Sequence, residues 1–355
     1  MKEIRKLKLA LTSSCTLNCN HCRIDKSSGL NMDFKMAKAG VDLLFSTPGD
    51  FKRLELYGGE PFLRFPLLKK ISSYAREKSA KTGKNLSLSV ATNATFLDDK
   101  ALSWIKESQA NISVSFSGSK ESHDYNRKFV SGEGSHSLVL KNVNKLFEKI
   151  GPDYLVCLYC VDGAFSKKMK RDFELILKSG FRMINVECVS GRGWSSENYS
   201  AFEKGFKSIL ERIEEGIEKA DFIFLEPFIE MISDRMSWDY SCPAYRDLEM
   251  YPDGYYGFYP YAFVDYAASR KKISVGKWSS GLNSRYSLCS PGCFSCQSCC
   301  SQYYTLPGLF DGSRAYELRS HLMKRFFFEL LRRKKEKEIK AYLCELKRIR
   351  GITYV

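Results

Sequence analysis

The sequence predicts an α/β fold in which a parallel sheet is followed by a cysteine-rich region. Two observations carry this prediction. Over the first 220 residues, strand-like runs alternate with longer helix-like runs six times, as in the successive β-α units of a parallel sheet. Segments with the residue types of a functional site follow five of these strands, so they would meet at the carboxyl edge of the sheet. Right-handed crossovers are expected to curl the sheet.

The expected elements follow in chain order. Apolar and β-branched runs predict six strands, at Leu7–Leu11, Arg53–Tyr57, Leu86–Thr92, Ile112–Ser117, Tyr154–Val161 and Phe181–Val189. Helical stretches lie between them, for example at Asp33–Phe45, Pro66–Lys81, Ser137–Lys149 and Lys168–Lys178. A further helix is expected at Asp221–Trp238, and the basic run within residues 313–350 predicts a helix with an apolar stripe. The expected domains are therefore residues 1–220, residues 221–312 with the additional cysteines, and a basic C-terminal helical segment at residues 313–355.

The composition fits a globular protein of the cytoplasm. The 355 residues are 44% hydrophobic, which is ample for a core. No apolar run approaches the roughly 18 to 20 residues that cross a bilayer. The start, Met1–Lys8, is charged throughout, unlike a secretory signal. We therefore expect a cytoplasmic protein with no membrane partner, in which thirteen cysteines indicate metal binding rather than disulfides.

The net charge of +15 is concentrated near the C-terminus. Residues 313–350 hold thirteen Lys or Arg and five Asp or Glu, so eight of the excess positive charges lie there. A terminal helix that packs on the body and exposes a basic face explains this pattern. A docking surface for an acidic peptide or another anion is the functional alternative. No known nucleic-acid-binding module is recognised, so nucleic acid is not the expected partner.

Three cysteines near the start, Cys15, Cys19 and Cys22, have the spacing C-x3-C-x2-C. Three thiolates so close together can bind three irons of a four-iron cluster and leave the fourth iron open, whereas most iron–sulfur proteins close the cluster with four. A zinc site or three unrelated thiols are the alternatives, although zinc ribbons favour paired C-x2-C units.

A second motif follows the next expected strand, where RLELYGGEPFL places two glycines before Glu60 and Pro61. Glycine permits a close backbone approach, and an ordinary turn before a helix is the alternative. The cysteine triplet and the GGEP segment together resemble the radical S-adenosylmethionine (radical SAM) family, whose fold is an open, partial (β/α)6 barrel. The resemblance covers about residues 7 to 300 and implies a [4Fe–4S] cluster that binds S-adenosylmethionine.

The resemblance extends along the following strands. TNAT looks like the family's TNG segment, and the stretch from Ser115 to Gly134 looks like its S-L-D-G, H-D, R and G-x-G series, with Ser117 in place of the aspartate. CVSGRGW ends the sixth strand with Gly191, Arg192 and Gly193. A solvated helix start is the alternative for HDYNR. The resemblance implies cofactor-binding residues Gly58, Gly59, Glu60, Asn93, Ser115 and Arg127.

A second group of cysteines lies beyond residue 240. It resembles the SPASM or twitch extension of radical SAM peptide-modifying enzymes, although Tyr259 replaces one cysteine of that pattern and the later spacing is tighter. We expect at least one auxiliary iron–sulfur cluster, of the [4Fe–4S] type, and a zinc knuckle is the alternative. The expected metal ligands here are Cys242, Cys289, Cys293, Cys296, Cys299 and Cys300.

Other candidate residues lie on the fifth and sixth expected strands. Cys157 and Cys160 are three residues apart, so they point to opposite faces of a strand and are interpreted as core residues. Asp162 and Glu187 lie near strand ends as candidate catalytic acids or bases, or as structural hydrogen-bond partners.

The resemblance implies a function. S-adenosylmethionine would be cleaved by one electron from a flavodoxin- or ferredoxin-type donor, and the resulting 5′-deoxyadenosyl radical would take hydrogen from a substrate. The extension favours a ribosomally made precursor peptide that receives a crosslink or another side-chain modification. A sugar or nucleoside substrate is one alternative, and a zinc-containing nucleic-acid-binding protein is another. No separate leader-binding domain is expected, because the barrel begins within the first ten residues.

Overall fold

The structure is a computed structural model that describes residues 3–22, 24–189, 194–226, 247–258, 274–284, 286, 313–333 and 336–350. The chain divides into two compact units, each made of several segments. The first unit comprises residues 1–113, 128–132 and 239–306, and the second comprises residues 114–127, 133–238 and 307–355. These units group segments by packing, and the domain boundaries expected from the sequence stay a prediction.

The first unit is built on parallel strands β1 (Lys6–Ala10), β2 (Phe51–Tyr57) and β3 (Asn85–Thr92). On the other side of β1, strand β8 (Asp247–Met250) is also parallel to it. Strands β9 (Tyr255–Phe258), β10 (Gly276–Lys277) and β11 (Gly281–Leu282) continue this edge in antiparallel order. A strand from the cysteine-rich half of the chain therefore extends the N-terminal sheet, which the sequence did not predict.

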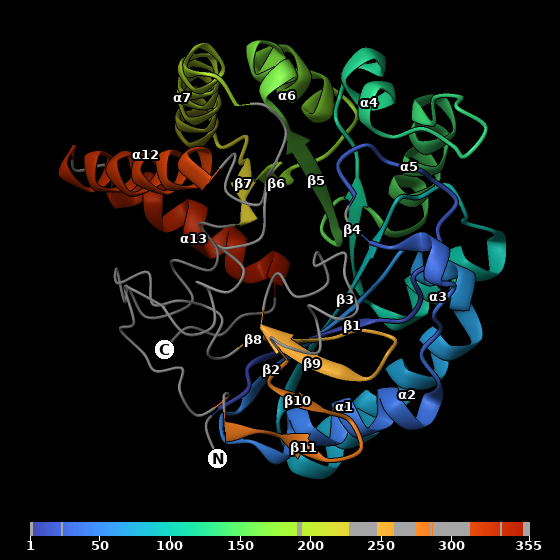
Figure 1. Cartoon of the computed structure of the whole chain (residues 1–355). Coiled ribbons are helices and arrows are strands. Elements are labelled where there is room, and N and C mark those ends of the chain that lie inside the picture. The colour runs from blue at the N-terminus through green and yellow to red at the C-terminus, as the bar shows by residue number, and fades with distance from the viewer. Residues whose placement is uncertain are drawn as a thin grey trace. The chain divides into compact units, whose positions relative to one another are not determined.

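One face of this sheet packs on helices, and Figure 1 shows α1 (Phe34–Ser46) and α2 (Phe65–Thr82) beside these strands. Leu7 and Leu9 of β1 point to this face and are fully buried, so the apolar half of the strand forms the core. Asp33 begins α1 by accepting a hydrogen bond from the Met36 amide at 2.7 Å. Helix α3 (Asp99–Ser108) follows β3.

The opposite face of β1 carries a ladder of buried and partly buried charges. Lys8 lies 3.3 Å from the Glu55 carboxylate of β2 and 3.4 Å from the Glu249 carboxylate of β8. Lys6, two residues before Lys8 and on the same face of the strand, lies 3.6 Å from Glu55 and 3.7 Å from Asp247. Burial by itself would raise the pKa of Glu55, but Lys8 and Lys6 outweigh it and lower that pKa to about 2. The ladder therefore ties β8 and β2 to the two sides of β1.

The second unit contains parallel strands β5 (Leu155–Val161), β6 (Met183–Cys188) and β7 (Phe224–Leu225). Strand β4 (Asn111–Ser115) is divided between the two units. The helices of this unit pack around its strands, and α7 contacts α6, α12 and α13 (Figure 1). These helices are α4 (Lys120–Asn126), α5 (His136–Ile150), α6 (Met169–Lys178), α7 (Ser196–Lys219), α12 (Ser313–Arg332) and α13 (Glu336–Arg350).

All six expected strands are present, within a few residues of the predicted bounds. The helix expected at Asp221–Trp238 is wrong in its first part, because β7 forms there by pairing with Met183 and Ile184 of β6. Residues 227–238 lie outside the described residues. The single basic helix is also wrong: the structure has two, with α12 ending at Arg332 and α13 beginning at Glu336.

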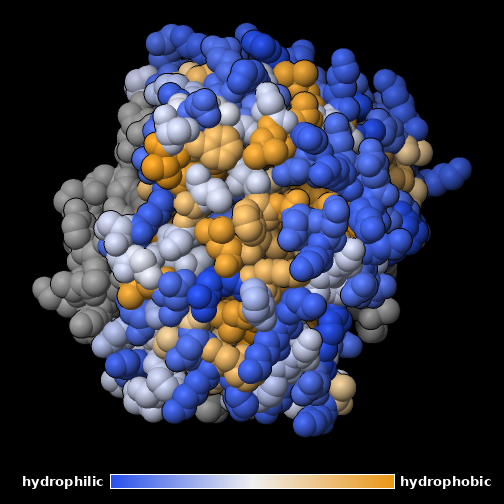
Figure 2. Space-filling model, turned by 90° about the vertical axis from the view of Figure 1, so that its right-hand side faces the viewer, coloured by the Kyte–Doolittle hydropathy of each residue, from blue (hydrophilic) through white to orange (hydrophobic). Residues whose placement is uncertain are grey.

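The C-terminal helices are amphipathic, as their pattern predicts. In α13 the Tyr342 ring is buried against Phe224, with 4.7 Å between ring centroids, while Lys337 and Lys340 are exposed. None of the described helices combines the length and apolarity needed to cross a membrane. Figure 2 shows one face of the molecule, on which hydrophobic residues lie among hydrophilic ones. The most exposed large apolar side chain of the described residues is Val130, at 77%.

Candidate cofactor site

The three N-terminal cysteines lie on one loop that directly follows β1. None of the three forms a disulfide, and all three are partly exposed. The Cys22 amide donates to the Cys19 carbonyl at 3.1 Å, which forms a turn that brings these two residues together. Cys22 packs against a small buried cluster that includes Ala10 of β1 and Tyr251, at the end of β8. The base of the loop is therefore held by both neighbouring strands.

The GGEP segment is hydrogen-bonded along its backbone to this cysteine loop. The Gly59 amide donates to the Thr12 carbonyl at 2.7 Å, and the Glu60 amide donates to the Ser14 carbonyl at 2.9 Å. A Cβ atom added to Gly59 would lie 2.1 Å from the Ser14 carbonyl oxygen, and Gly58 has a φ of 140°. Only glycine fits this contact between two backbones. This backbone contact explains why both positions are glycine, whether or not a ligand binds nearby.

Glu60 is fully buried and anchors the ends of two strands. One carboxylate oxygen accepts from the Thr92 hydroxyl at 2.8 Å and the Phe62 amide at 3.1 Å. The other accepts from the Asn93 amide at 2.9 Å. Burial raises the pKa of Glu60 to about 7, although these three donors favour the charged form. The side chain therefore fixes the start of η2 (Pro61–Arg64) and the loop after β3.

Asn93 reaches from the loop after β3 to the cysteine loop. Its Nδ2 donates to the Cys15 sulfur at 3.3 Å and to the Thr16 hydroxyl at 3.0 Å. Its Oδ1 accepts from the Thr95 amide at 2.9 Å and the Thr95 hydroxyl at 2.7 Å. The Thr16 and Thr95 hydroxyls are themselves 2.6 Å apart. The sequence singled out Asn93 but not its two threonine neighbours, although both lie within the motifs.

The Cys15 sulfur accepts a second hydrogen bond, from the Leu17 amide at 3.4 Å. Burial raises the pKa of the Cys15 thiol to about 11, and the nearby Glu60, Cys19 and Cys22 also raise it, while the Leu17 amide lowers it. The free thiol therefore stays protonated near neutral pH, and a bound metal would have to displace its proton.

Residues 128–132 hold the middle of the cysteine loop. The Asn18 amide donates to the Lys128 carbonyl at 2.7 Å, and an isolated antiparallel bridge joins Leu17 to Phe129. Leu17 is fully buried, whereas Asn18 is exposed. Nothing in the local pattern of these residues predicts the contact, because its two sides are more than 100 residues apart in the chain.

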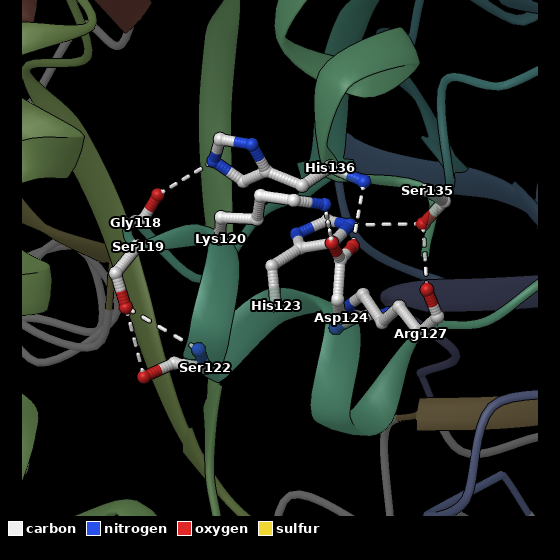
Figure 3. Close-up of polar contacts among 9 residues, drawn as sticks. All are labelled: Gly118, Ser119, Lys120, Ser122, His123, Asp124, Arg127, Ser135 and His136. Atoms are coloured by element: carbon white, nitrogen blue, oxygen red, sulfur yellow. Dashed lines mark hydrogen bonds and ion pairs between the residues drawn. The ribbon is translucent and has the colours of Figure 1, made fainter. Parts of the chain in front are cut away.

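In the second unit, the carbonyl of Arg127 is held by a buried polar network (Figure 3). The Ser135 hydroxyl donates to this carbonyl at 2.7 Å, so the His123 Nε2, 3.1 Å away, donates to that hydroxyl. His136 donates its backbone amide to Asp124 at 2.8 Å, and its ring lies 5.5 Å from that of His123. These hydrogen bonds hold Arg127 and Ser135, eight residues apart in the chain, close together.

The Arg127 side chain is 4% exposed, and its guanidinium donates to the Cys160 sulfur at 3.1 Å. The interpretation of Cys160 as a core residue is therefore wrong, because its side chain is partly exposed and contacts a cation. The interpretation is confirmed for Cys157, which is fully buried and donates to the Phe116 carbonyl at 3.2 Å. The alternation of a β-strand had already placed these two cysteines on different faces.

The two candidate acids have different surroundings. Asp162 is 2% exposed and uses both carboxylate oxygens, one for the Phe165 amide at 3.1 Å and one for the Asn126 amide group at 2.9 Å. The bond from Phe165 caps η3 (Gly163–Lys168), and the bond from Asn126 joins this cap to the end of α4, so both are structural. Glu187 is more exposed, accepts from Asn185 at 2.8 Å and faces Cys160 across the β5–β6 pair.

Ser115 is the last residue of β4 and is partly buried. Several expected site residues lie outside the described residues, so the structure places none of them. They are Gly191, Arg192, Gly193, Cys242, Cys289, Cys293, Cys296, Cys299 and Cys300.

The donor set on the cysteine loop fits an iron–sulfur cluster. Within the described ranges, no three His, Cys, Asp or Glu side chains converge as ligands of a single metal ion do. A cluster makes a different demand, because each thiolate binds a separate iron. Three partly exposed thiols on one loop, with an amide group directed at the first sulfur, meet that demand.

Comparison with known proteins agrees with this chemistry. A family model described as the radical SAM superfamily matches residues 9–180. An uncharacterised protein of Methanocaldococcus jannaschii is 32% identical over 140 residues, which are 39% of this chain and 48% of that protein. A cysteine-type anaerobic sulfatase-maturating enzyme of Clostridium novyi is 23% identical over 225 residues, 60% of this chain and 59% of the enzyme. The chain thus spans about half of the length of these relatives.

Two solved structures share the fold. Native anSMEcpe with bound AdoMet and Cp18Cys peptide gives a TM-score of 0.69 at 17% identity, over 93% of this chain and 99% of that chain. SuiB of Streptococcus suis bound to precursor peptide SuiA gives 0.52 at 12% identity, over 75% and 61%. The family model thus matches residues 9–180, a little under half of this chain, as the radical SAM superfamily, and these solved structures share the fold.

Proposed function

We propose that this chain is a radical SAM enzyme in which Cys15, Cys19 and Cys22 hold three irons of a [4Fe–4S] cluster. One observation supports this proposal above the others. Residues from three separate motifs, Glu60, Asn93 and Cys15, form a continuous hydrogen-bonded chain in the first unit. Motifs that had arisen by chance would have no reason to be joined in this way.

When bound, the cluster and S-adenosylmethionine would supply one-electron cleavage of the sulfonium and a carbon radical that abstracts hydrogen. The residues of the chain bind and orient these groups. The loop that carries the three cysteines is fixed by the backbone of Gly59 and Glu60, so the thiols are positioned before the cluster binds. Arg127 and Ser115 are proposed to bind polar groups of the nucleotide, and Glu187 is the proposed acid or base of the second unit.

We infer that the substrate is a peptide whose side chain is crosslinked or otherwise modified. Support comes from two structures of the same fold that contain peptides, Cp18Cys in one and SuiA in the other. The proposed auxiliary cluster, held by cysteines among Cys242, Cys289, Cys293, Cys296, Cys299 and Cys300, is consistent with such a role. A flavodoxin- or ferredoxin-type protein is the proposed electron donor.

The cofactor half of the proposal is tested by anaerobic reconstitution with iron and sulfide. Replacing Cys15, Cys19 and Cys22 together by alanine should remove about four irons per chain and abolish 5′-deoxyadenosine formation with dithionite. Cys344→Ala is the matched control, because Cys344 is exposed on α13 in the second unit. Full iron content and unchanged 5′-deoxyadenosine formation in the triple variant would contradict the assignment.

The substrate half needs a separate measurement. Short peptides encoded beside this chain's reading frame are incubated with the reconstituted enzyme, and their masses are compared with and without S-adenosylmethionine. Deuterium at the modified carbon should appear in 5′-deoxyadenosine. Transfer from a sugar or nucleoside, with no change in any peptide, would replace the peptide by a small molecule and leave the cofactor assignment intact.

A further inference from the structure

We propose that Asn93 is a positioning residue for the cluster. Its side chain holds the Cys15 sulfur through an N–H···S hydrogen bond and thereby tunes the reduction potential of the cluster. This inference deepens the proposed function and rests on Cys15 being a cluster ligand. It assigns Asn93 a role different from the nucleotide contact expected from the sequence.

The orientation of the Asn93 amide follows from its partners. Oxygen and nitrogen of an amide are interchangeable in shape, so their placement is decided by the hydrogen bonds. The Thr95 backbone N–H can only donate, and it lies 2.9 Å from one end of the amide, which must therefore be the oxygen. The other end, 3.3 Å from the Cys15 sulfur, is then the NH2 group. The sulfur thus faces a donor.

The amide has no remaining hydrogen-bonding capacity. Its two N–H groups point to Cys15 and Thr16, and its oxygen accepts two bonds from Thr95. An amide supplies two donors and two acceptor sites, and all four are used inside the protein. A nucleotide contact by Asn93 would break one of these bonds.

The backbone of Asn93 is held as firmly as its side chain. Its amide donates to the buried Glu60 carboxylate at 2.9 Å, and the Thr92 hydroxyl donates to the same carboxylate at 2.8 Å. Asn93 itself is only 7% exposed. The donor is therefore fixed before any cluster binds, so directing it at the sulfur requires no further ordering.

This geometry has a defined electrostatic consequence. A thiolate ligand carries negative charge, which a neighbouring N–H group stabilises, and the gain is larger in the reduced cluster because its charge is more negative. Hydrogen bonds to ligand sulfurs are one of the factors that set cluster potentials. Asn93 should therefore make the cluster easier to reduce than the same cluster without this donor.

The test compares midpoint potentials in EPR-monitored redox titrations of the reconstituted full chain. The spectrum of the Cys15, Cys19 and Cys22 triple alanine variant is subtracted, so that only this cluster is followed. Asn93→Ala removes the donor and should shift the potential to a more negative value. Asn93→Asp keeps the shape but places a carboxylate beside the sulfur, and should shift it further. Asn18→Ala, in the same loop, loses an amide whose oxygen contacts Lys26, and should leave the potential unchanged.

A second readout is the Fe–S stretching frequency in resonance Raman spectra, which should rise when the sulfur loses its hydrogen bond. An Asn93 variant that has the melting temperature of the parent but binds no iron at Cys15, Cys19 and Cys22 also supports the proposal, because the Cys15 sulfur has then lost the hydrogen bond that positions it. Should both variants fail to fold, Asn93→Ser takes their place in the same measurements. Fully loaded Asn93 variants with unchanged potentials and frequencies overturn the inference. A parent chain that binds no iron at these cysteines refutes the proposed function instead.

Discussion

The buried carboxylate of Glu60 gives a prediction about stability that can be calculated from the structure. Its pKa is raised by burial to about 7, against 4.5 for an ordinary glutamate. The folded state therefore binds this proton more tightly than the unfolded state. The resulting stabilisation is complete below pH 4.5 and is lost as the pH rises through 7. Between pH 5 and pH 8 the contribution of Glu60 to the free energy of unfolding falls by about 2.5 kcal/mol.

Glu60→Gln removes this titration, although the neutral side chain leaves the Asn93 amide without its acceptor, at a pH-independent cost of about 1–3 kcal/mol. The free energy of unfolding of the variant minus that of the parent should rise by about 2.5 kcal/mol from pH 5 to pH 8.

The assay is urea denaturation of the iron-free chain under reducing conditions at four pH values. Burial raises the pKa of Cys15 to about 11, so this thiol does not titrate over that range. Glu107→Gln is the control, because Glu107 is exposed on α3, and its difference from the parent should not change with pH. A Glu60→Gln difference that is equally flat would show that the buried carboxylate is not destabilised, and the reasoning would fail.

Three further predictions concern the charge ladder and the two candidate acids. Lys8→Met removes the lysine that Glu55 and Glu249 share, while Lys6 stays 3.6 Å from Glu55. The free energy of unfolding at pH 7 should fall by about 3–5 kcal/mol; a loss below about 1 kcal/mol in urea denaturation would contradict the ladder's role. Asp162→Ala removes the cap and should lower the free energy of unfolding by about 1 kcal/mol, while product formed per folded chain stays unchanged. Glu187→Gln should reduce product formation while 5′-deoxyadenosine still forms, and equal product from both variants would exclude Glu187 as the proposed acid or base.

The sequence located the strands well because each has a local apolar pattern and follows a recognisable connection. It also located the motifs at the carboxyl ends of those strands, including Cys15, Glu60 and Asn93. It failed at residues 221–226, where β7 exists through its pairing with β6 rather than through its own composition. It likewise failed to find β8 beside β1, because parallel pairing between segments more than 230 residues apart leaves no local signal.

Cys160 shows the same division on the scale of a single side chain. Strand alternation placed it on a different face from Cys157, but only the packed second unit shows that its sulfur accepts a hydrogen bond from the Arg127 guanidinium. Asp162 is a comparable case, since its position at a strand end suggested chemistry, whereas its bond to Phe165 caps η3 and its bond to Asn126 joins that cap to α4.

By itself, the sequence determined the order of strands and helices and the three-thiol spacing, since both are properties of neighbouring residues. The tertiary structure alone decided which groups those residues meet. It brought the side-chain amide of Asn93 within hydrogen-bonding distance of the Cys15 sulfur, and the Glu60 carboxylate within hydrogen-bonding distance of the Asn93 backbone amide. The physical reason is that hydrogen bonds and burial depend on groups brought together by folding, which lie 33 to 78 residues apart here.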